Sequence, residues 1–325
     1  MKKISIMVPC YNEEDNVIPM SEALVAELEK LSEYDYEILF IDNCSLDTTR
    51  AKLREICAGN KKIRAIFNSK NFGQFNSPYY GLCQTTGDCT ISICCDFQDP
   101  VEMIPRFVNE WENGAKIVCA IKTSSKESKI MYFLRSVYYK TIKKLSKVEQ
   151  IEHFTGFGLY DKTFVDVLRN LDDPTPFIRG IVAELGPKIV KIEYQQAQRR
   201  AGKTSNNFFS LYDAAMLSFT SYTKIGSRFA SFLGIFMCGL SSLLGLGTAA
   251  ALVTRIVLSL IPTVDVSMYA NEPVLFAVAL AALVSVFVGG MVLFFVGLLG
   301  EYVINMNARI MNRPLVIEEE RINFD

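Results

Sequence analysis

Three carboxylates and one pair of arginines are the residues of this chain whose positions best suit chemistry. Glu13, Asp42 and Asp96 each follow or close a short apolar run. A carboxylate at such a position can accept hydrogen bonds from a ribose or a base, or it can bind a hard cation such as Mg²⁺. Arg199 and Arg200 precede a glycine, and their guanidinium forks match phosphate oxygens. These residue types favour chemistry at a phosphate group.

Strands alternating with helices are expected to position these side chains. The apolar runs predict four strands, at Ile4–Pro9, Tyr36–Asp42, Ile63–Asn68 and Cys89–Cys94. Helical patterns lie between these strands: one ends at Leu31, one covers about 47–58 and one covers 78–85. Such alternation predicts an α/β domain with a mostly parallel sheet, whose strands bind ligands at their carboxyl ends. Neither a GxGxxG nor a GxxxxGK[ST] motif is present, so dinucleotide and P-loop sites are set aside.

The composition divides the chain into a polar head and an apolar tail. Of 325 residues, 50% are hydrophobic and 21% charged, and 30 of the 34 Lys and Arg precede residue 229. The net charge of −1 argues against nucleic acid as a partner. The single histidine, His153, excludes a histidine-rich metal site. Nine cysteines without a CxxC pair indicate reduced thiols in a cytosolic compartment.

Two uncharged runs in the tail are long enough to cross a bilayer. Phe229–Thr254 has 26 residues and Pro273–Gly300 has 28, whereas roughly 20 suffice. Their length disfavours the alternative of two buried helices in a soluble domain. The connecting loop Pro262–Glu272 lacks Lys and Arg, so both ends of the pair are expected to face the cytoplasm.

Two further segments suggest contact with the membrane surface. Aromatic and polar residues alternate over Asn206–Ser227, which predicts an amphipathic interfacial helix. Lys116–Lys147 carries nine basic residues against Glu127, and it suits either a solvated helix face or a surface against anionic headgroups. The predicted domains are a cytosolic head, 1–205, an interfacial helix, 206–228, and a tail, 229–325, with membrane helices at about 229–260 and 273–303 and a short cytosolic end.

Motifs along nearly the whole chain resemble a known family. They are Val8-Pro9-Cys10-Tyr11-Asn12-Glu13-Glu14, Phe40-Ile41-Asp42-Asn43, Asn71-Phe72-Gly73, Asp96-Phe97-Gln98-Asp99-Pro100, Arg199-Arg200-Ala201-Gly202-Lys203-Thr204 and Gly297-Leu298-Leu299-Gly300-Glu301-Tyr302. In this order they resemble glycosyltransferase family 2, with its GT-A fold. The whole chain is similar to the polyprenyl-phosphate glycosyltransferase branch, which includes dolichol-phosphate mannose synthase and relatives with two C-terminal membrane helices.

The resemblance implies a nucleotide-sugar site with a divalent metal ion. The positions expected to bind the donor are Pro9, Tyr11, Glu13, Asp42 and Asn71. For Tyr11 and Asn12, ordinary turn chemistry is the alternative. Asp96 is the expected ligand of Mg²⁺ or Mn²⁺, with the Gln98 carbonyl as a second ligand that also faces the substrate. Asp99 is a candidate catalytic residue, and its alternative role is a helix N-cap before Pro100.

The acceptor is expected to meet the basic loop. The resemblance places Arg199 and Arg200 at the reaction, with Lys203 and Thr204 beside the substrate. Arg135 from the basic stretch is a further candidate. The alternative for this loop is charge that only contacts the membrane surface.

Three departures from the family pattern bear on the chemistry. Cys94 replaces the first acidic residue of Asp-x-Asp, and Asn43-Cys44 replaces Asp-Gly. Gly156 and Gly158 replace an acidic and a basic residue often thought to act at the acceptor. A phosphate acceptor removes the need for a base, because it is largely ionised at neutral pH. His153 is expected to be a loop residue rather than that base.

The resemblance therefore implies an inverting hexosyltransferase at the cytosolic face of a bacterial inner membrane. It would use a UDP-sugar donor, a polyprenyl (undecaprenyl) phosphate acceptor and a divalent metal ion. Two alternatives stay open: another lipid or surface-glycan acceptor, and a catalytically silent membrane scaffold that binds nucleotide sugar. Similar proteins imply a homo-oligomer, with a tetramer as one expectation.

Overall fold

The computed structural model describes residues 1–123, 151–171, 173–201, 272–311 and 313–324, together with scattered positions from 212 to 260. The chain divides into two compact units. The first comprises Met1–Tyr222 and Asn305–Asp325, and the second comprises Thr223–Ile304.

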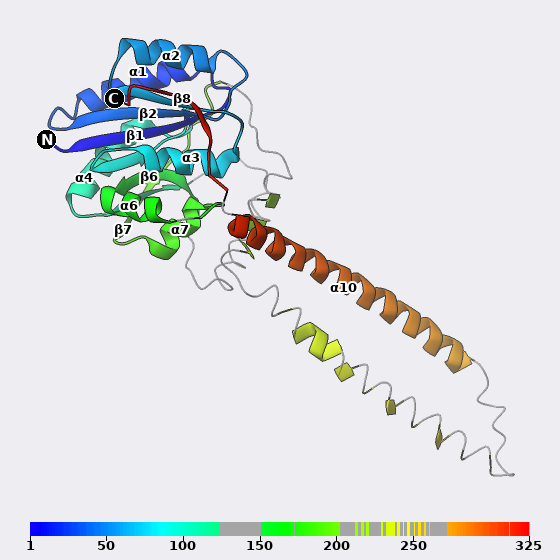
Figure 1. The fold of residues 1–325 in the computed structure, drawn as a ribbon. Coiled ribbons are helices and arrows are strands. Elements are labelled where there is room, and N and C mark those ends of the chain that lie inside the picture. The colour runs from blue at the N-terminus through cyan, green and yellow to red at the C-terminus, as the bar shows by residue number, and fades with distance from the viewer. Residues whose placement is uncertain are drawn as a thin grey trace. The chain divides into compact units, whose positions relative to one another are not determined.

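A mixed sheet forms the centre of the first unit. Among the described residues its order is β7-β5-β6-β4-β1-β2-β3-β8. The pairs β1–β2, β1–β4, β2–β3 and β5–β7 are parallel, and β6 and β8 pair antiparallel with their neighbours. The strand bounds are β1 Lys3–Cys10, β2 Asp35–Asp42, β3 Ile63–Asn68, β4 Cys89–Ser92, β5 Ile117–Lys122, β6 Phe154–Asp161, β7 Ile189–Tyr194 and β8 Glu318–Ile322. The expected α/β head with a mostly parallel sheet is confirmed (Figure 1).

Helices cover both faces of this sheet because strand residues alternate between them. Ile6 of β1 packs in one apolar cluster with Leu24 and Phe107, whereas its neighbour Met7 packs in a second cluster with Tyr79 and Val182. The helices of the first layer are α1 Val17–Glu29, α2 Thr49–Gly59 and α4 Ile104–Glu112, which follows a 3₁₀ turn at Val101–Met103; those of the second are α3 Gly73–Gln84, α6 Lys162–Asn170 and α7 Ile178–Leu185.

Two element boundaries differ from the sequence-based expectation. The helix expected across 78–85 begins at Gly73. The Asn71 side chain accepts a hydrogen bond from the Gly73 backbone N–H at 2.8 Å, and so the first turn is anchored before Pro78. The residues after 303 were expected to be a short tail, but Glu318–Ile322 forms β8 against β3. The sequence of this strand, Glu-Glu-Glu-Arg-Ile, has no alternation of apolar and polar residues that would have predicted it.

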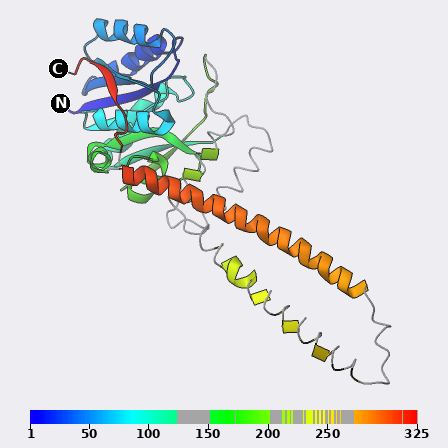
Figure 2. The same cartoon turned by 45° about the vertical axis from the view of Figure 1, so that its right-hand side comes forward.

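A 40-residue helix, α10 Glu272–Met311, contains the second predicted membrane span (Figure 2). Within the described part of the chain, Phe287–Met311 is the segment with the length and apolar composition of a membrane span. None of that segment is buried, and Leu293 is 73% exposed. A core helix of a soluble protein would be covered, so this surface suits lipid.

The first predicted span is described only in part. Residues 232–237 are helical, and the rings of Phe229 and Phe295 lie 6.2 Å apart. Leu233 and Met237 line the same apolar hollow as Phe295 of α10. These contacts place residues of the first predicted span beside α10. Most of the predicted interfacial helix, 206–228, and most of the basic stretch, 116–147, lie outside the described residues.

Candidate active site

A cleft of about 700 Å³ opens at the carboxyl ends of β1 to β4. Seven of the predicted site residues line it: Pro9, Tyr11, Glu13, Asn71, Asp96, Asp99 and Arg199. Asp42, Gln98 and Arg200 lie next to it without lining it. Arg135, Lys203 and Thr204 lie outside the described residues. Parallel strands converge at this edge, and therefore residues about 190 positions apart in sequence share one cleft.

The loops after β1 and β2 are tied together beneath the cleft. The Asn12 backbone N–H donates to the Ser45 hydroxyl at 2.8 Å, and the Asn12 side chain accepts from the Leu46 N–H at 2.8 Å. Asn12 has φ of 54° and Cys44 has φ of 65°, conformations in which side chains are uncommon. Asn12 therefore fixes the turn, and both Tyr11 and Asn12 line the cleft.

Asp42 lies behind these loops with its side chain fully buried. Its carboxylate accepts a hydrogen bond from the Ser45 N–H at 3.1 Å and lies 3.3 Å from the Arg50 guanidinium. Burial raises the pKa of Asp42, and the contacts with Ser45 and Arg50 act in the opposite direction. In this structure Asp42 shapes the loop rather than facing the cleft.

Asn43 is a cleft residue that the sequence analysis noted only as a departure. Its side-chain amide donates to the Asn71 side chain at 2.9 Å, and its carbonyl accepts from the Phe72 N–H at 2.9 Å. It thereby joins the ends of β2 and β3 at the cleft wall. Its position directly after Asp42, at the end of a predicted strand, could have indicated that Asn43 lines the cleft.

Asp96 and Glu13 share a cation in this structure. The Arg199 guanidinium lies 2.8 Å from the Asp96 carboxylate and 3.8 Å from that of Glu13. Burial raises the pKa of Glu13, while the Asn16 side chain and Arg199 act to lower it. The second Asp96 oxygen accepts from the Gln98 N–H at 3.1 Å. At this end of the cleft, two carboxylates therefore face one positive group.

The same end fits a divalent metal ion only if substrate completes the shell. Within the described residues, His, Cys, Asp and Glu side chains form no group of three that could hold a metal ion. Mg²⁺ ordinarily takes one or two carboxylates together with phosphate oxygens and water. Cys94 is exposed at this site, and a neutral thiol is a poor ligand for such an ion. The donor set therefore fits a metal ion held jointly by Asp96 and a diphosphate.

Asp99 does not cap a helix. Its carboxylate accepts hydrogen bonds from the Tyr194 hydroxyl at 3.0 Å and from the Cys94 N–H at 3.2 Å. The residue before the 3₁₀ turn is Pro100, and no side chain caps that turn. Burial raises the pKa of Asp99 to about 6, although both hydrogen bonds favour the charged form. Asp99 is thus a titratable cleft residue, and the N-cap alternative is wrong.

We expect Tyr194→Phe to shift the acidic limb of the activity profile to higher pH. Removing the hydroxyl removes a donor to the charged carboxylate, which raises the pKa of Asp99 above its present value of about 6. The shift should be roughly half to one pH unit, since such a bond contributes about 1 kcal/mol. The measurement is kcat/KM for sugar transfer between pH 5 and pH 8. The phenylalanine retains the ring that packs 5.3 Å from Phe157, and an unmoved limb would contradict the assignment.

The backbone at Gly156 and Gly158, where the resemblance led us to expect an acidic and a basic residue, disfavours larger side chains. A Cβ at Gly158 would lie 2.1 Å from the Val118 carbonyl oxygen across the β5–β6 pair. Gly156 has φ of 106°, which disfavours any larger residue. His153 precedes β6 with φ of 59° and does not line the cleft. The described lining of the cleft therefore contains no histidine, and position 156 has no side chain that could act as a base.

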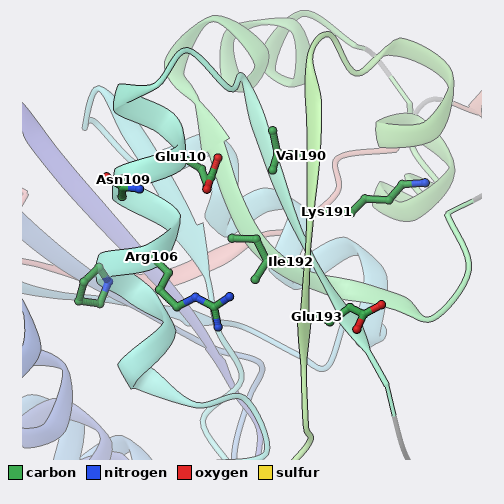
Figure 3. A pocket seen from close by; sticks show the side chains of 8 residues that line it. Arg106, Asn109, Glu110, Val190, Lys191, Ile192 and Glu193 are labelled. Carbon is green, nitrogen blue, oxygen red and sulfur yellow. The ribbon is translucent and has the colours of Figure 1, made fainter.

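A second hollow, of about 560 Å³, lies between α4 and β7. Arg106 and Glu110 of α4 and Val190 and Ile192 of β7 point into it, whereas Lys191 points away (Figure 3). Its lining includes none of the predicted site residues, and it is not at the carboxyl ends of the central parallel strands. The cleft beside Asp96 is the better candidate.

Comparison with known proteins decides the family. The profile of Glycosyl transferase family 2 matches residues 5–168, half of the chain. The chain belongs to glycosyl transferase family 2. This family 2 glycosyltransferase is 30% identical over 316 residues to the SfII prophage-derived bactoprenol glucosyl transferase of Shigella flexneri, with 97% of both chains covered. It is 29% identical over 320 residues to the bactoprenol glucosyl transferase of Shigella phage SfX, with 98% and 99% covered.

The resemblance to the polyprenyl-phosphate branch is confirmed by these nearly full-length matches. Among solved structures, glucosyl-3-phosphoglycerate synthase from Mycobacterium tuberculosis in complex with Mn²⁺, UDP-glucose and phosphoglyceric acid is 17% identical. It covers 67% of this chain and 78% of its own, with a TM-score of 0.45, a likeness too low to inform the site.

Proposed function

We propose that this family 2 glycosyltransferase transfers a hexose from a UDP-sugar to a polyprenyl phosphate at the cytosolic face of the bacterial inner membrane. The observation that carries the proposal is the 2.8 Å ion pair between Asp96 and Arg199. It brings together the carboxylate expected at the donor diphosphate and the arginine expected at the acceptor phosphate. The names of the relatives make glucose and undecaprenyl phosphate the first substrates to assay.

The residues of the cleft suit a displacement that needs no base. The acceptor phosphate oxygen would form the new bond to the sugar C1 as the bond from C1 to UDP breaks, with inversion. UDP leaves with the electron pair, and no proton is transferred, because the phosphate is already ionised. Arg199 would hold the attacking phosphate, and Asn43, Asn71 and Tyr11 line the donor side.

A divalent ion, Mg²⁺ or Mn²⁺, would be held by Asp96 and by the Gln98 carbonyl together with the donor. When bound, it would stabilise the negative charge of the leaving diphosphate. Gln98 does not line the cleft in this structure, and its backbone carbonyl accepts from the Ala197 N–H at 3.2 Å.

The decisive experiment follows radiolabelled sugar into extracted lipid. The purified full-length chain should transfer glucose from UDP-glucose to undecaprenyl phosphate, in the presence of Mg²⁺ or Mn²⁺, and not to neutral undecaprenol. A chain that binds UDP-glucose but transfers to none of several lipid and glycan acceptors would support the silent scaffold instead. A homo-oligomer, such as a tetramer, stays a prediction that sedimentation of the detergent-solubilised chain can test.

The proposed topology makes a separate prediction. Because the loop Pro262–Glu272 lacks Lys and Arg, we expect it to lie outside the cytoplasm. A cysteine introduced there, in a background without the nine native cysteines, should react with a membrane-impermeant maleimide on intact cells. A cysteine in the head, for example at exposed Leu46, is the matched control and should react only after permeabilisation. The reverse pattern would overturn the orientation.

A further inference from the structure

The strand that follows the long apolar helix returns to the head and ends beside the donor loops. In β8, Glu319 pairs with Arg50 of α2 at 2.8 Å, and Glu320 pairs with Arg54 at 2.6 Å. Both arginines also lie over the ring of Phe67, at 5.1 and 4.8 Å. The two pairs thus share the Phe67 ring, although the Arg50 side chain is 19% exposed and that of Arg54 45%.

The pairs also differ in a contact with the donor loops. Arg50 Nε lies 3.3 Å from the completely buried Asp42 carboxylate, whereas within the described part of the chain Arg54 pairs with Glu320 and not with Asp42. Arg50 Nε makes no aligned hydrogen bond within the described residues, so its attraction to Asp42 is electrostatic. Arg50 is therefore the cation that faces the buried carboxylate.

From Asp42 a chain of hydrogen bonds reaches the cleft. The Asp42 carboxylate accepts from the Ser45 N–H at 3.1 Å, and the Ser45 hydroxyl accepts from the Asn12 N–H at 2.8 Å. Asn12 lies between Tyr11 and Glu13, and all three line the cleft. A change at Arg50 can therefore alter the loop that faces the donor.

We propose that Arg50 is a positioning residue for the donor nucleotide and that Glu319 of β8 orients it. Strand β8, which follows the apolar helix α10, would then contribute indirectly to binding of the donor. This inference rests on the proposed function, because it assumes that the cleft binds a UDP-sugar. Arg50 acts only through Asp42 and the loops, since it does not line the cleft itself.

The burial of each group sets the expected size of its effect. Removing Arg50 leaves the buried Asp42 carboxylate without its facing cation, a costly change. The Glu319 side chain is 53% exposed, and an ion pair of this kind contributes little. The effect of Glu319 should therefore be smaller than that of Arg50 and in the same direction.

The test compares Arg50→Met with Arg54→Met in the full-length chain in detergent, using titration calorimetry with UDP and Mn²⁺. We expect Arg50→Met to weaken UDP binding about tenfold or more and Arg54→Met to change it less than about twofold. In the transfer assay, the donor KM should rise for Arg50→Met while the KM for the lipid phosphate stays constant. Arg50→Lys, which keeps the charge, should recover part of the affinity.

A second pair guards against misfolding. Glu319→Gln and Glu320→Gln alter only partly exposed groups, and the first should weaken UDP binding about two- to fivefold while the second leaves it unchanged. If the wild type binds UDP but Arg50→Met and Arg54→Met have equal UDP affinities, and so do Glu319→Gln and Glu320→Gln, the positioning role of Arg50 is overturned and the donor site is not. A wild-type chain that does not bind UDP would overturn the proposed donor site and this role together.

Discussion

Replacing Asp96 with alanine is expected to abolish sugar transfer, whereas Cys94→Ala should reduce it only mildly. Asp96 is a nearly buried carboxylate at the cation end of the cleft, 2.8 Å from Arg199. A neutral thiol at Cys94 adds little to the binding of a hard cation. We expect a loss on the order of a thousandfold in kcat/KM for Asp96→Ala, since both metal binding and leaving-group stabilisation would be lost. Initial rates with labelled UDP-glucose measure both variants.

Manganese binding gives a readout that does not depend on turnover. Electron paramagnetic resonance with Mn²⁺ and UDP should show bound metal for the wild type and for Cys94→Ala, and none for Asp96→Ala. Cys94→Asp restores the acidic residue of the family pattern and should tighten Mn²⁺ binding. Equal damage from Cys94→Ala and Asp96→Ala would refute the assignment of Asp96, and unaltered Mn²⁺ affinity in Cys94→Asp would refute a shared site.

Arg199→Ala should lower kcat/KM for the lipid phosphate on the order of a hundredfold, because a charged contact is lost at a partly desolvated site. The sequence treated Arg199 and Arg200 alike, but the structure separates them. Arg199 pairs with Asp96 and lines the cleft, whereas the Arg200 guanidinium lies 5.3 Å from the Phe97 ring. Arg200→Ala is therefore the matched control, with a smaller expected loss. Steady-state kinetics with varied lipid phosphate measure the difference.

The same experiment tests the acceptor. The KM for UDP-glucose should change less than that for the lipid phosphate, because Asp96, Asn43 and Asn71 all remain to hold the donor. Wild-type kinetics in the double variant Arg199→Ala, Arg200→Ala would refute the phosphate-acceptor proposal. So would efficient transfer to a neutral polyprenol, which lacks both the charge and the ionised oxygen.

Local sequence patterns were sufficient to predict the central strands and several of the residues that line the cleft. The runs ending at Pro9, Asp42 and Asn68 are short, apolar and followed by polar residues, and each forms a strand within a residue or two of its expected bounds. The order of these strands in a parallel sheet brings their carboxyl ends to one edge. For this reason Glu13 and Asp96 could be placed together without a structure.

Contacts between distant segments could not be predicted in this way. The role of Asp99 depends on Tyr194, which is 95 residues away, and the local Asp-Pro pattern favoured a helix cap instead. The burial of Asp42 depends on Arg50 and on the closure of the loop at Ser45. Strand β8 is rich in glutamate and has no apolar alternation that would indicate its pairing with β3.

The position of β8 also sets an order of events during synthesis. Its first residue, Glu318, lies 250 positions after the last residue of β3, Asn68 (318 minus 68), and both apolar segments are made in between. At about 5–20 residues per second, the ribosome needs roughly 12–50 s for that stretch. During this interval the outer edge of β3 lacks its partner, and an unpaired strand edge is prone to wrong pairing. The sheet of the head is thus completed only after both apolar segments have been synthesised.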